Sequence, residues 1–509
     1  MVLNQSLTMR QNRQKASRKT VGINEILQFC NLIVACLILS GFFNEELSKN
    51  PYVDSLTLVL GLTLCLQNYI ALRMEKRNPN PFILLMVFPL TFFYSLRIFT
   101  LTLYPVQEVF ERFSYGPEDS NYALFYILLA NIFVYAGFYR IKTKNTAEVD
   151  VADSYPAKPH VLMVIFILSL LFSLFIQQKL PESIEADVNR IYSSLLTPNM
   201  VLLVLATYII IYRKTLSPKY LTFVLVSALI LVGIQTLSFS RGGLLTLFDN
   251  SLILVLALIP SIRIPRKYVF LGFVLVPVLL PIAFTLFSIS TYTRTIKGDM
   301  GGSLAEKIWL LQESRSALKD NPRTEFFMGH ALARAGSFDF SAEIIAHRAQ
   351  YAGIFTLRNY AASIADNLLT PGFDIFDQPR ISASLKSGYL NFGMASQKAE
   401  REAGHSDQIG MYGELYSLFW WFSLLVFYFF AYYLKKIFYS SWQSGPFLIA
   451  LKRVFTMVIF YRFINSFGLD WIVFDLATIA VAFYSISRVS GLHSSGVRSR
   501  LNGTALPCR

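Results

Sequence analysis

Residues 268–290 read YVFLGFVLVPVLLPIAFTLFSIS, an apolar run that is long enough to cross a bilayer as one helix. The chain then turns polar from residue 291 to residue 410, before apolar stretches return. Carriers and channels usually keep their connections short, because their chemistry lies near the bilayer midplane. The long insert at 291–410 therefore suggests a protein that works at a membrane surface.

The composition of the whole chain is typical of a polytopic membrane protein. Of 509 residues, 54% are hydrophobic and only 15% are charged, with a mean hydropathy of +0.46; a soluble chain carries about 25% charged residues. A net charge of +14 is typical of a protein that binds nucleic acid, but the basic residues here form short clusters beside apolar stretches. That distribution indicates orientation in a membrane, and no nucleic-acid partner is expected.

No metal or cofactor is expected either. The four cysteines have no metal-ligand spacing. Asp366, Asp374 and Asp377 match no metal motif, and the chain has no phosphate-binding loop of the kind that uses ATP.

The predicted fold class is all-α, a polytopic transmembrane helical bundle of about twelve spans. The expected spans are 23–43, 54–72, 82–102, 121–139, 161–177, 199–212, 221–238, 244–260, 268–290, 413–434, 446–466 and 470–487.

Alternate connections between these spans are basic, and this pattern orients the chain. Cytoplasmic connections are enriched in Lys and Arg, which places both termini in the cytoplasm and the insert outside it. The expected organisation is a basic N-terminal arm at 1–22, spans one to nine at 23–290, the extracytoplasmic loop at 291–410, spans ten to twelve at 411–487 and a basic tail at 488–509. The basic connections contain Arg73, Lys76 and Arg77; Arg140, Lys142 and Lys144; Arg213, Lys214 and Lys219; Arg263, Arg266 and Lys267; and Lys435 and Lys436.

The insert is expected to be a large helical loop. Apolar residues recur at helical spacing over 304–311, and Pro322 then stops the helix. The insert is also rich in arginine, whose planar guanidinium suits phosphate. Ordinary solvent-exposed arginines are the simpler interpretation for any one of them.

Two short motifs at the outer face carry candidate chemistry. Ser238-Phe-Ser240-Arg241-Gly242-Gly243 lies between spans seven and eight, where the glycines are expected to allow a tight reversal. An arginine at this face is not explained by the enrichment of basic residues on the cytoplasmic side, so Arg241 is a candidate functional residue. The alternative is an arginine whose side chain merely extends to the membrane–water interface.

The second motif closes the insert as Gly404-His405-Ser406, with Glu414 at the start of span ten. Histidine is the side chain best suited to act as a base near neutral pH. His330 and His347 are also external and remain competitors. Asp249, Arg462 and Asp475 lie in or beside spans, and pairs among them would suit a proton-coupled carrier.

Taken together, these motifs resemble the bacterial O-antigen polymerase and O-antigen ligase superfamily. The Ser-Arg-Gly turn, a Trp309-containing helix before Lys319-Asp-Asn-Pro322, and His405-Ser406 followed by Glu414 occur in the family's order. The family's Arg before the loop Trp is absent, since Leu304, Ala305, Glu306 and Lys307 occupy those positions. Arg294 and Arg315 are therefore the candidates for a second phosphate-binding arginine.

The resemblance implies a GT-C-like membrane enzyme, a metal-independent glycosyltransferase of a bacterial inner membrane. Its donor and acceptor would be glycans linked to polyprenyl (undecaprenyl) diphosphate, and a chain-length regulator protein is a further expected partner. Arg241 with Arg315 or Arg294 would bind the diphosphate and His405 would be the base, with Glu414, Ser240, Gly242 and Gly243 in support. Polymerase is favoured over ligase; a glycolipid flippase or proton-coupled transporter, and a structural or receptor protein, are the other classes left open.

Overall fold

The computed structural model is mostly helical. It describes residues 20–45, 47–77, 80–103, 115–141, 159–172, 197–237, 241–258, 263–267, 269–271, 274, 309, 337–351, 355–368, 410–440, 446–465, 469, 472–473 and 476. The predicted spans at 268–290 and 470–487 lie almost entirely outside these residues.

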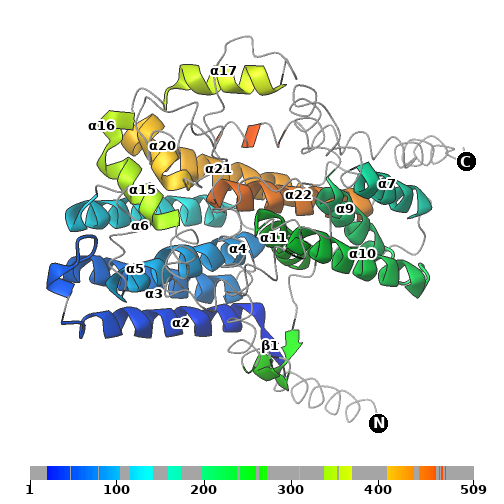
Figure 1. The fold of residues 1–509 in the computed structure, drawn as a ribbon, viewed down its shortest axis with the longest axis horizontal. Coiled ribbons are helices and arrows are strands. Elements are labelled where there is room, and N and C mark those ends of the chain that lie inside the picture. Colours follow the sequence, from blue (N-terminus) through cyan, green and yellow to red (C-terminus); the bar gives the residue numbers. More distant parts are fainter. Residues whose placement is uncertain are drawn as a thin grey trace, which may run out of the picture.

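The helices of residues 23–140 and the helix that follows the insert form one group of packed helices (Figure 1). Helix α2 packs on α3, α3 packs on α6, and α6 packs along α21. The α6–α21 contact is close because Gly137 has no side chain: a Cβ there would lie 2.4 Å from the Tyr428 carbonyl oxygen. The bounds are α2 Ile23–Gly41, η1 Leu47–Lys49, α3 Ser55–Arg77, α6 Pro117–Arg140, α20 Met411–Phe419, η6 Trp420–Phe422 and α21 Ser423–Tyr439.

The third apolar stretch is an interrupted helix. It starts as α4 (Pro81–Pro89), passes through a π-helical turn η2 (Leu90–Ser95) and ends as α5 (Leu96–Leu103). Pro89 lies at the junction, and a proline has no backbone N–H to continue the α-helical hydrogen bonds. Asn80 caps the start by accepting a hydrogen bond from the Phe82 N–H at 3.2 Å.

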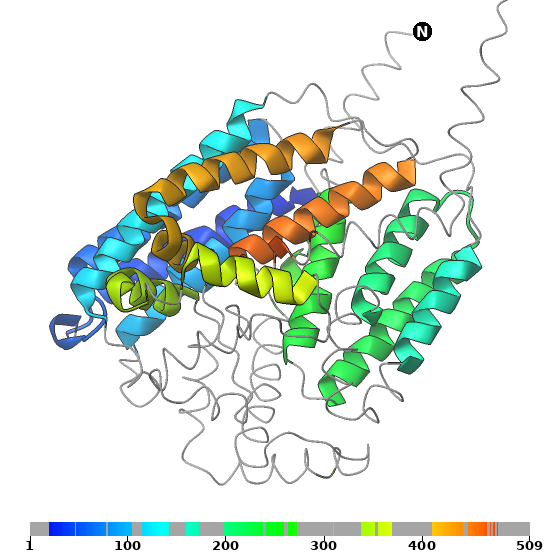
Figure 2. The same cartoon turned by 90° about the horizontal axis from the view of Figure 1, so that it is seen from above.

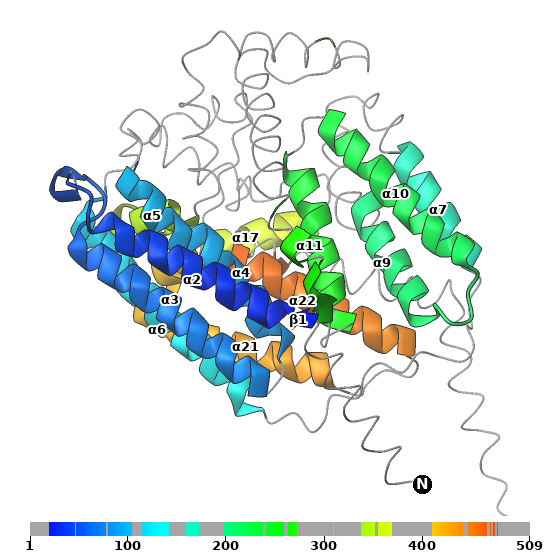
Figure 3. The ribbon, with the colours of Figure 1, turned by 90° about the horizontal axis from the view of Figure 1, so that it is seen from below.

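A second group of helices lies beside the first and contacts it through α11 and α22 (Figure 3). Helix α9 is its centre and packs against α7, α10 and α22. The bounds are α7 Pro159–Leu171, α9 Pro198–Ile211, α10 Pro218–Leu237, α11 Arg241–Leu258 and α22 Pro446–Asn465. Seen from above, α22 and α11 lie between the first group and helices α7, α9 and α10 (Figure 2).

Contacts between helix ends define two ends of the bundle. At one end, strand β1 (Thr20–Gly22) pairs with β2 (Arg263–Pro265), so the all-α prediction missed one short strand pair. At the other end, Asn50 donates to the Leu101 carbonyl at 2.7 Å, and Ser120 donates to the Tyr52 carbonyl at 2.7 Å. These contacts lie at opposite ends of the bundle; we call the second the Asn50 end.

In the part of the insert that the structure describes, three helices pack against the bundle: α15 (Ser337–Ala346), α16 (Arg348–Tyr351) and α17 (Leu357–Leu368). Helix α15 lies between α6 and α20, and α17 runs across the top of the molecule in Figure 1. Phe338, Ala342 and Ile344 of α15 are fully buried. This part of the insert is thus built into the helix bundle, which differs from the solvated loop expected from its polarity.

Within the described residues, five helical stretches are long and apolar enough to cross a membrane: Ile23–Gly41, Ser55–Lys76, Pro81–Thr102, Pro117–Arg140 and Met411–Tyr439. Each overlaps a predicted span. Four shorter apolar helices, Pro159–Leu171, Pro198–Ile211, Pro218–Ile234 and Asp249–Leu258, overlap four more. A membrane protein with several spanning helices is therefore supported, while the count of twelve stays a prediction.

Candidate functional site

A network of buried charges lies where α15 meets the third apolar stretch and the start of α6. Arg97 Nε donates to Asp339 Oδ2 at 2.8 Å, and both side chains are almost completely buried. The Tyr115 hydroxyl donates to the other carboxylate oxygen, Asp339 Oδ1, at 2.7 Å. Asp339 thereby joins three segments that are far apart in the sequence.

Glu343, one helical turn after Asp339, extends the network. Its Oε2 accepts the Tyr115 backbone N–H at 3.1 Å, and its Oε1 accepts the Tyr351 hydroxyl at 3.4 Å. His347 Nε2 lies 3.8 Å from Glu343 Oε2. Asp339 and Glu343 lie on one face of α15 because residues four apart do so in a helix.

The tyrosines of this network are held in the protonated form. Burial raises the pKa of Tyr115 well above its ordinary value, and the negative charge of Asp339 raises it further. Burial, then the charges of Asp339 and Glu343, raises the pKa of Tyr52, and burial with Glu343 raises that of Tyr351. The Tyr115 and Tyr351 phenols therefore act as hydrogen-bond donors to Asp339 and Glu343 at physiological pH.

Glu414 is the one predicted site residue whose side chain the structure describes. It lies in the first turn of α20, is buried, and accepts hydrogen bonds at Oε1 from the Tyr360 hydroxyl and from the Leu469 N–H, the latter at 3.0 Å. Tyr360 belongs to α17 of the insert. Glu414 therefore ties the insert to the start of the helix that follows it.

Gly413 explains how α20 comes so close to α15. A Cβ at Gly413 would lie 3.2 Å from the Ser341 Cα and 3.3 Å from the Ile344 Cβ. The neighbouring Tyr412 hydroxyl donates to Asn131 Oδ1 of α6 at 2.5 Å. The start of α20 is thus held between the insert and the bundle.

The predicted turn around Arg241 is displaced. Helix α10 ends at Leu237 and α11 begins at Arg241, so Gly242 and Gly243 belong to the first helical turn of α11. The prediction that these glycines form a turn is wrong, because both are helical; the residues that join α10 to α11, 238–240, lie outside the described residues. Ser240 lies in that stretch, outside the described residues, and only the backbone of Arg241 is described.

His405, Arg294 and Arg315 lie outside the described residues, so their positions stay predictions. The expected pairing among Asp249, Arg462 and Asp475 takes a different form at Asp249, whose Oδ1 accepts the Tyr461 hydroxyl at 2.5 Å. Tyr461 lies on α22 and Asp249 on α11, so this bond joins two helices of the second group.

The sequence analysis did not select Arg97, Tyr115, Asp339 or Glu343. A signal was present for Arg97, since a charged residue inside a predicted span is by itself a reason to suspect function. The sequence also contained a signal for Asp339 and Glu343. These two acids are four residues apart in a short segment that is otherwise rich in apolar residues. An apolar helix that carries two acids on one face needs polar partners elsewhere in the fold.

Within the described ranges, no three His, Cys, Asp or Glu side chains are grouped so that they could hold a metal ion. Comparison of the chain with protein-family models, with curated proteins and with solved structures finds no match.

Proposed function

We propose that this protein is a membrane-embedded glycosyltransferase that polymerises a surface polysaccharide of the O-antigen or capsule type. It would transfer a growing glycan from polyprenyl diphosphate to the hydroxyl of another lipid-linked repeat, outside the cytoplasm. The proposal includes about twelve spans in a bacterial inner membrane, with both termini cytoplasmic. Its basis is the resemblance of the Arg241, Trp309 and His405 motifs, together with the geometry below.

The observation that carries the proposal is that Arg241 starts a helix at the end away from the β1–β2 pair, while Glu414, which closes the His405 motif, is bound to the insert. Helix α11 ends at Leu258, shortly before β2, so Arg241 lies at the end of α11 that points away from the β1–β2 pair (Figure 3). His405 precedes Gly410 by five residues, which limits their Cα separation to about 18 Å. Glu414, just beyond, is fixed to α17 of the insert.

In the proposed reaction, the acceptor hydroxyl oxygen forms a bond with the anomeric carbon of the donor sugar while the bond from that carbon to the diphosphate oxygen breaks. His405 takes the hydroxyl proton. The departing diphosphate gains negative charge, which Arg241 and a second arginine, Arg315 or Arg294, would stabilise. The donor carries its own activation, so the step needs no nucleotide.

Glu414 has a supporting role in this proposal. Its Oε1 contacts hold α17 and residue 469 against α20. It would therefore act by fixing the segment that follows His405.

A proton-coupled carrier or glycolipid flippase is the second candidate, and a specific observation favours it. Arg97 with Asp339, and Asp249 with Tyr461, place ionisable groups within apolar helices or against them. Such groups are common in proton pathways of transporters. An O-antigen ligase would use the same donor and differs only in its acceptor.

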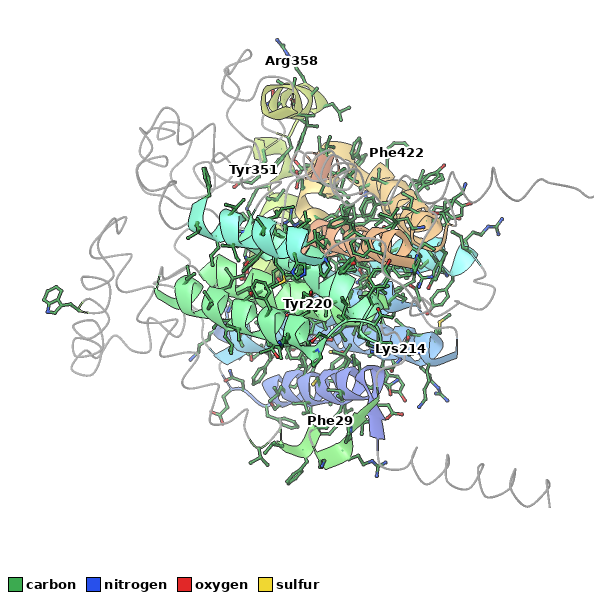
Figure 4. All side chains as sticks on the ribbon, turned by 90° about the vertical axis from the view of Figure 1, so that its right-hand side faces the viewer. Phe29, Lys214, Tyr220, Tyr351, Arg358 and Phe422 are labelled. Carbon is green, nitrogen blue, oxygen red and sulfur yellow. The ribbon has the colours of Figure 1, made fainter. Side chains whose placement is uncertain are left out.

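The deciding experiment is the glycolipid profile of cells that carry Arg241→Ala or His405→Ala in place of the native protein, with Arg358→Ala as the matched control. Arg358 is an exposed arginine of α17 that points away from the body of the protein (Figure 4). The polymerase proposal expects loss of long polysaccharide with single repeats still exported, and no effect of Arg358→Ala. Unchanged polymer in both variants contradicts the catalytic assignment.

The same profile separates the alternatives. A carrier predicts that single repeats accumulate on the cytoplasmic face, and that Asp339→Asn is more harmful than His405→Ala. A ligase predicts that polymer is made but stays on polyprenyl diphosphate.

A further inference from the structure

The helical segment that follows the insert is interrupted by a sharp bend at Trp420, which folds α20 back so that Tyr412 stacks on Phe427 of α21. This interruption presents aromatic rings at the surface. Helix α20 ends at Phe419, the 3₁₀ turn η6 covers Trp420–Phe422, and α21 starts at Ser423. Trp420 has a positive φ of 51°, which a tryptophan rarely adopts and which costs conformational energy. Its indole Nε1 donates to the Tyr416 hydroxyl at 2.9 Å, which helps to hold this conformation.

Because of this interruption, Trp420 and Phe422 are exposed. Half of the Trp420 surface and 73% of that of Phe422 are accessible, and Phe422 lies on the outside of the molecule in Figure 4. Tyr122 of α6 lies at the same turn, since its ring makes edge contacts with those of Tyr416 and Trp421. Tryptophan and tyrosine are the residues that concentrate where a membrane meets water.

A cation, the guanidinium of Arg348, lies over this aromatic surface. The guanidinium carbon of Arg348, on α16, lies 5.9 Å from the centroid of the Trp420 ring. Among the described residues no carboxylate forms an ion pair with Arg348, and its buried Nε has no hydrogen-bond partner. A guanidinium placed in this way offers hydrogen-bond donors to an anionic ligand.

Below the rings, an apolar stripe continues along α21. Phe422, Leu425, Phe429 and Tyr433 recur at spacings of three and four residues, and each is about half exposed or more. From Phe422 to Tyr433 the stripe is about 16 Å long. This is about half of the hydrocarbon thickness of a bilayer, and thus the depth of one leaflet.

We propose that Arg348, Trp420 and Tyr122 bind the phosphate headgroup of a bilayer phospholipid, with one of its acyl chains along the stripe of α21. The ligand class follows from the chemistry: a guanidinium fork fits one phosphodiester, the rings suit the interface, and the stripe fits one acyl chain. A diphosphate would need further cations, and Arg348 is the only Lys or Arg that we find over these rings within the described ranges. The site is therefore separate from the proposed glycan reaction and does not depend on it.

The test uses the purified full-length protein in detergent and measures lipid binding by native mass spectrometry. The probes are phosphatidylglycerol and diacylglycerol with the same acyl chains, which differ in the phosphate headgroup, and polyprenyl diphosphate. The variants are Arg348→Gln and the control Arg358→Gln. We expect Arg348→Gln to weaken phosphatidylglycerol binding about ten-fold and to leave diacylglycerol binding unchanged. Arg358→Gln should change neither.

Equal phosphatidylglycerol binding by Arg348→Gln and the native protein would overturn the proposal, and so would an equal loss for diacylglycerol. Selective loss of polyprenyl diphosphate binding would also overturn it, since Arg348 would then belong to the glycan reaction. A second variant, Leu425→Glu, places a charge in the stripe and should weaken both acylated probes. Thermal unfolding of each variant shows that the comparison is made between folded proteins.

Discussion

Arg97 and Asp339, 242 positions apart in the sequence, form a buried ion pair in which Arg97 Nε lies 2.8 Å from Asp339 Oδ2. The pair joins the third apolar stretch to a helix of the insert. A buried charge that loses its partner is costly, whereas the intact pair is close to neutral in free energy. The pair therefore fixes where α15 docks more than it adds to overall stability.

We expect Asp339→Ala to lower the free energy of unfolding by about 3–5 kcal/mol, because Arg97 then remains buried without its carboxylate. Thermal unfolding of the purified protein in detergent measures the change. Glu25→Ala is the matched control: its pair with Lys76, at 3.0 Å, is largely exposed and should contribute less than about 1 kcal/mol. Equal shifts for the two variants would contradict the assignment.

Gly137→Ala should separate α6 from α21. The new Cβ would lie 2.4 Å from the Tyr428 carbonyl oxygen, which is backbone and can move only with its helix. We expect a loss of about 1–3 kcal/mol in unfolding free energy. Gly233→Ala in α10 meets nothing within 4 Å and should be neutral or stabilising by up to about 1 kcal/mol. If Gly137→Ala were as stable as Gly233→Ala, the close contact would be wrong.

Tyr360→Phe should loosen α17 locally. The change removes the hydroxyl that donates to Glu414, and a hydrogen bond to a charged group contributes about 1.5–3 kcal/mol. Hydrogen exchange of the amides of α17 should therefore rise at least ten-fold, while exchange in α6 stays unchanged. Arg358→Gln, an exposed position of the same helix, serves as the control. A uniform rise over the whole protein would indicate global destabilisation instead.

Asp54 predicts a pH dependence of stability at the Asn50 end of the bundle. Burial raises the pKa of Asp54, but hydrogen bonds from the Thr57 N–H, the Thr57 hydroxyl and the Asn121 amide outweigh it, so the pKa is below its ordinary value of 3.8. The stabilisation is therefore complete above that ordinary value and is lost as the pH falls through the lower folded-state pKa.

Melting temperatures measured between about pH 2.5 and pH 6 test this dependence. This window extends about one to two pH units on either side of the ordinary Asp pKa. The native protein should lose more stability in acid than Asp54→Asn, which keeps an oxygen acceptor and cannot titrate. Parallel curves for the two proteins would remove Asp54 as the cause.

The long helices could be predicted from the sequence because each is a continuous apolar run of about the same length as the helix. The prediction of 121–139 corresponds to α6, and 82–102 corresponds to α4 through α5. The docking of α15 could not be predicted in this way. Its ten residues include Asp339 and Glu343, which indicate a solvated helix until Arg97 and Tyr115 are known to face them.

In the candidate site, too, local features could be predicted from the sequence and tertiary contacts could not. The position of Glu414 at the start of an apolar helix followed from local pattern, but its bonds to Tyr360 and Leu469 depend on tertiary packing. The turn before Arg241 was expected at the glycines because glycine permits turns. In the structure, Gly242 and Gly243 belong to the first helical turn of α11.

The π-helical turn at Leu90–Ser95 determines the direction around the helix axis in which the later side chains of the third apolar stretch point. A π-turn holds one residue more than an α-turn, so it advances the following residues by about 100° around the helix axis. Arg97 lies just after this turn and faces Asp339 with that advance included. Deleting one residue from the π-turn would keep the stretch apolar and helical, yet would rotate Arg97 out of the core toward a neighbouring face. Span length and ion-pair geometry are therefore encoded separately in this segment.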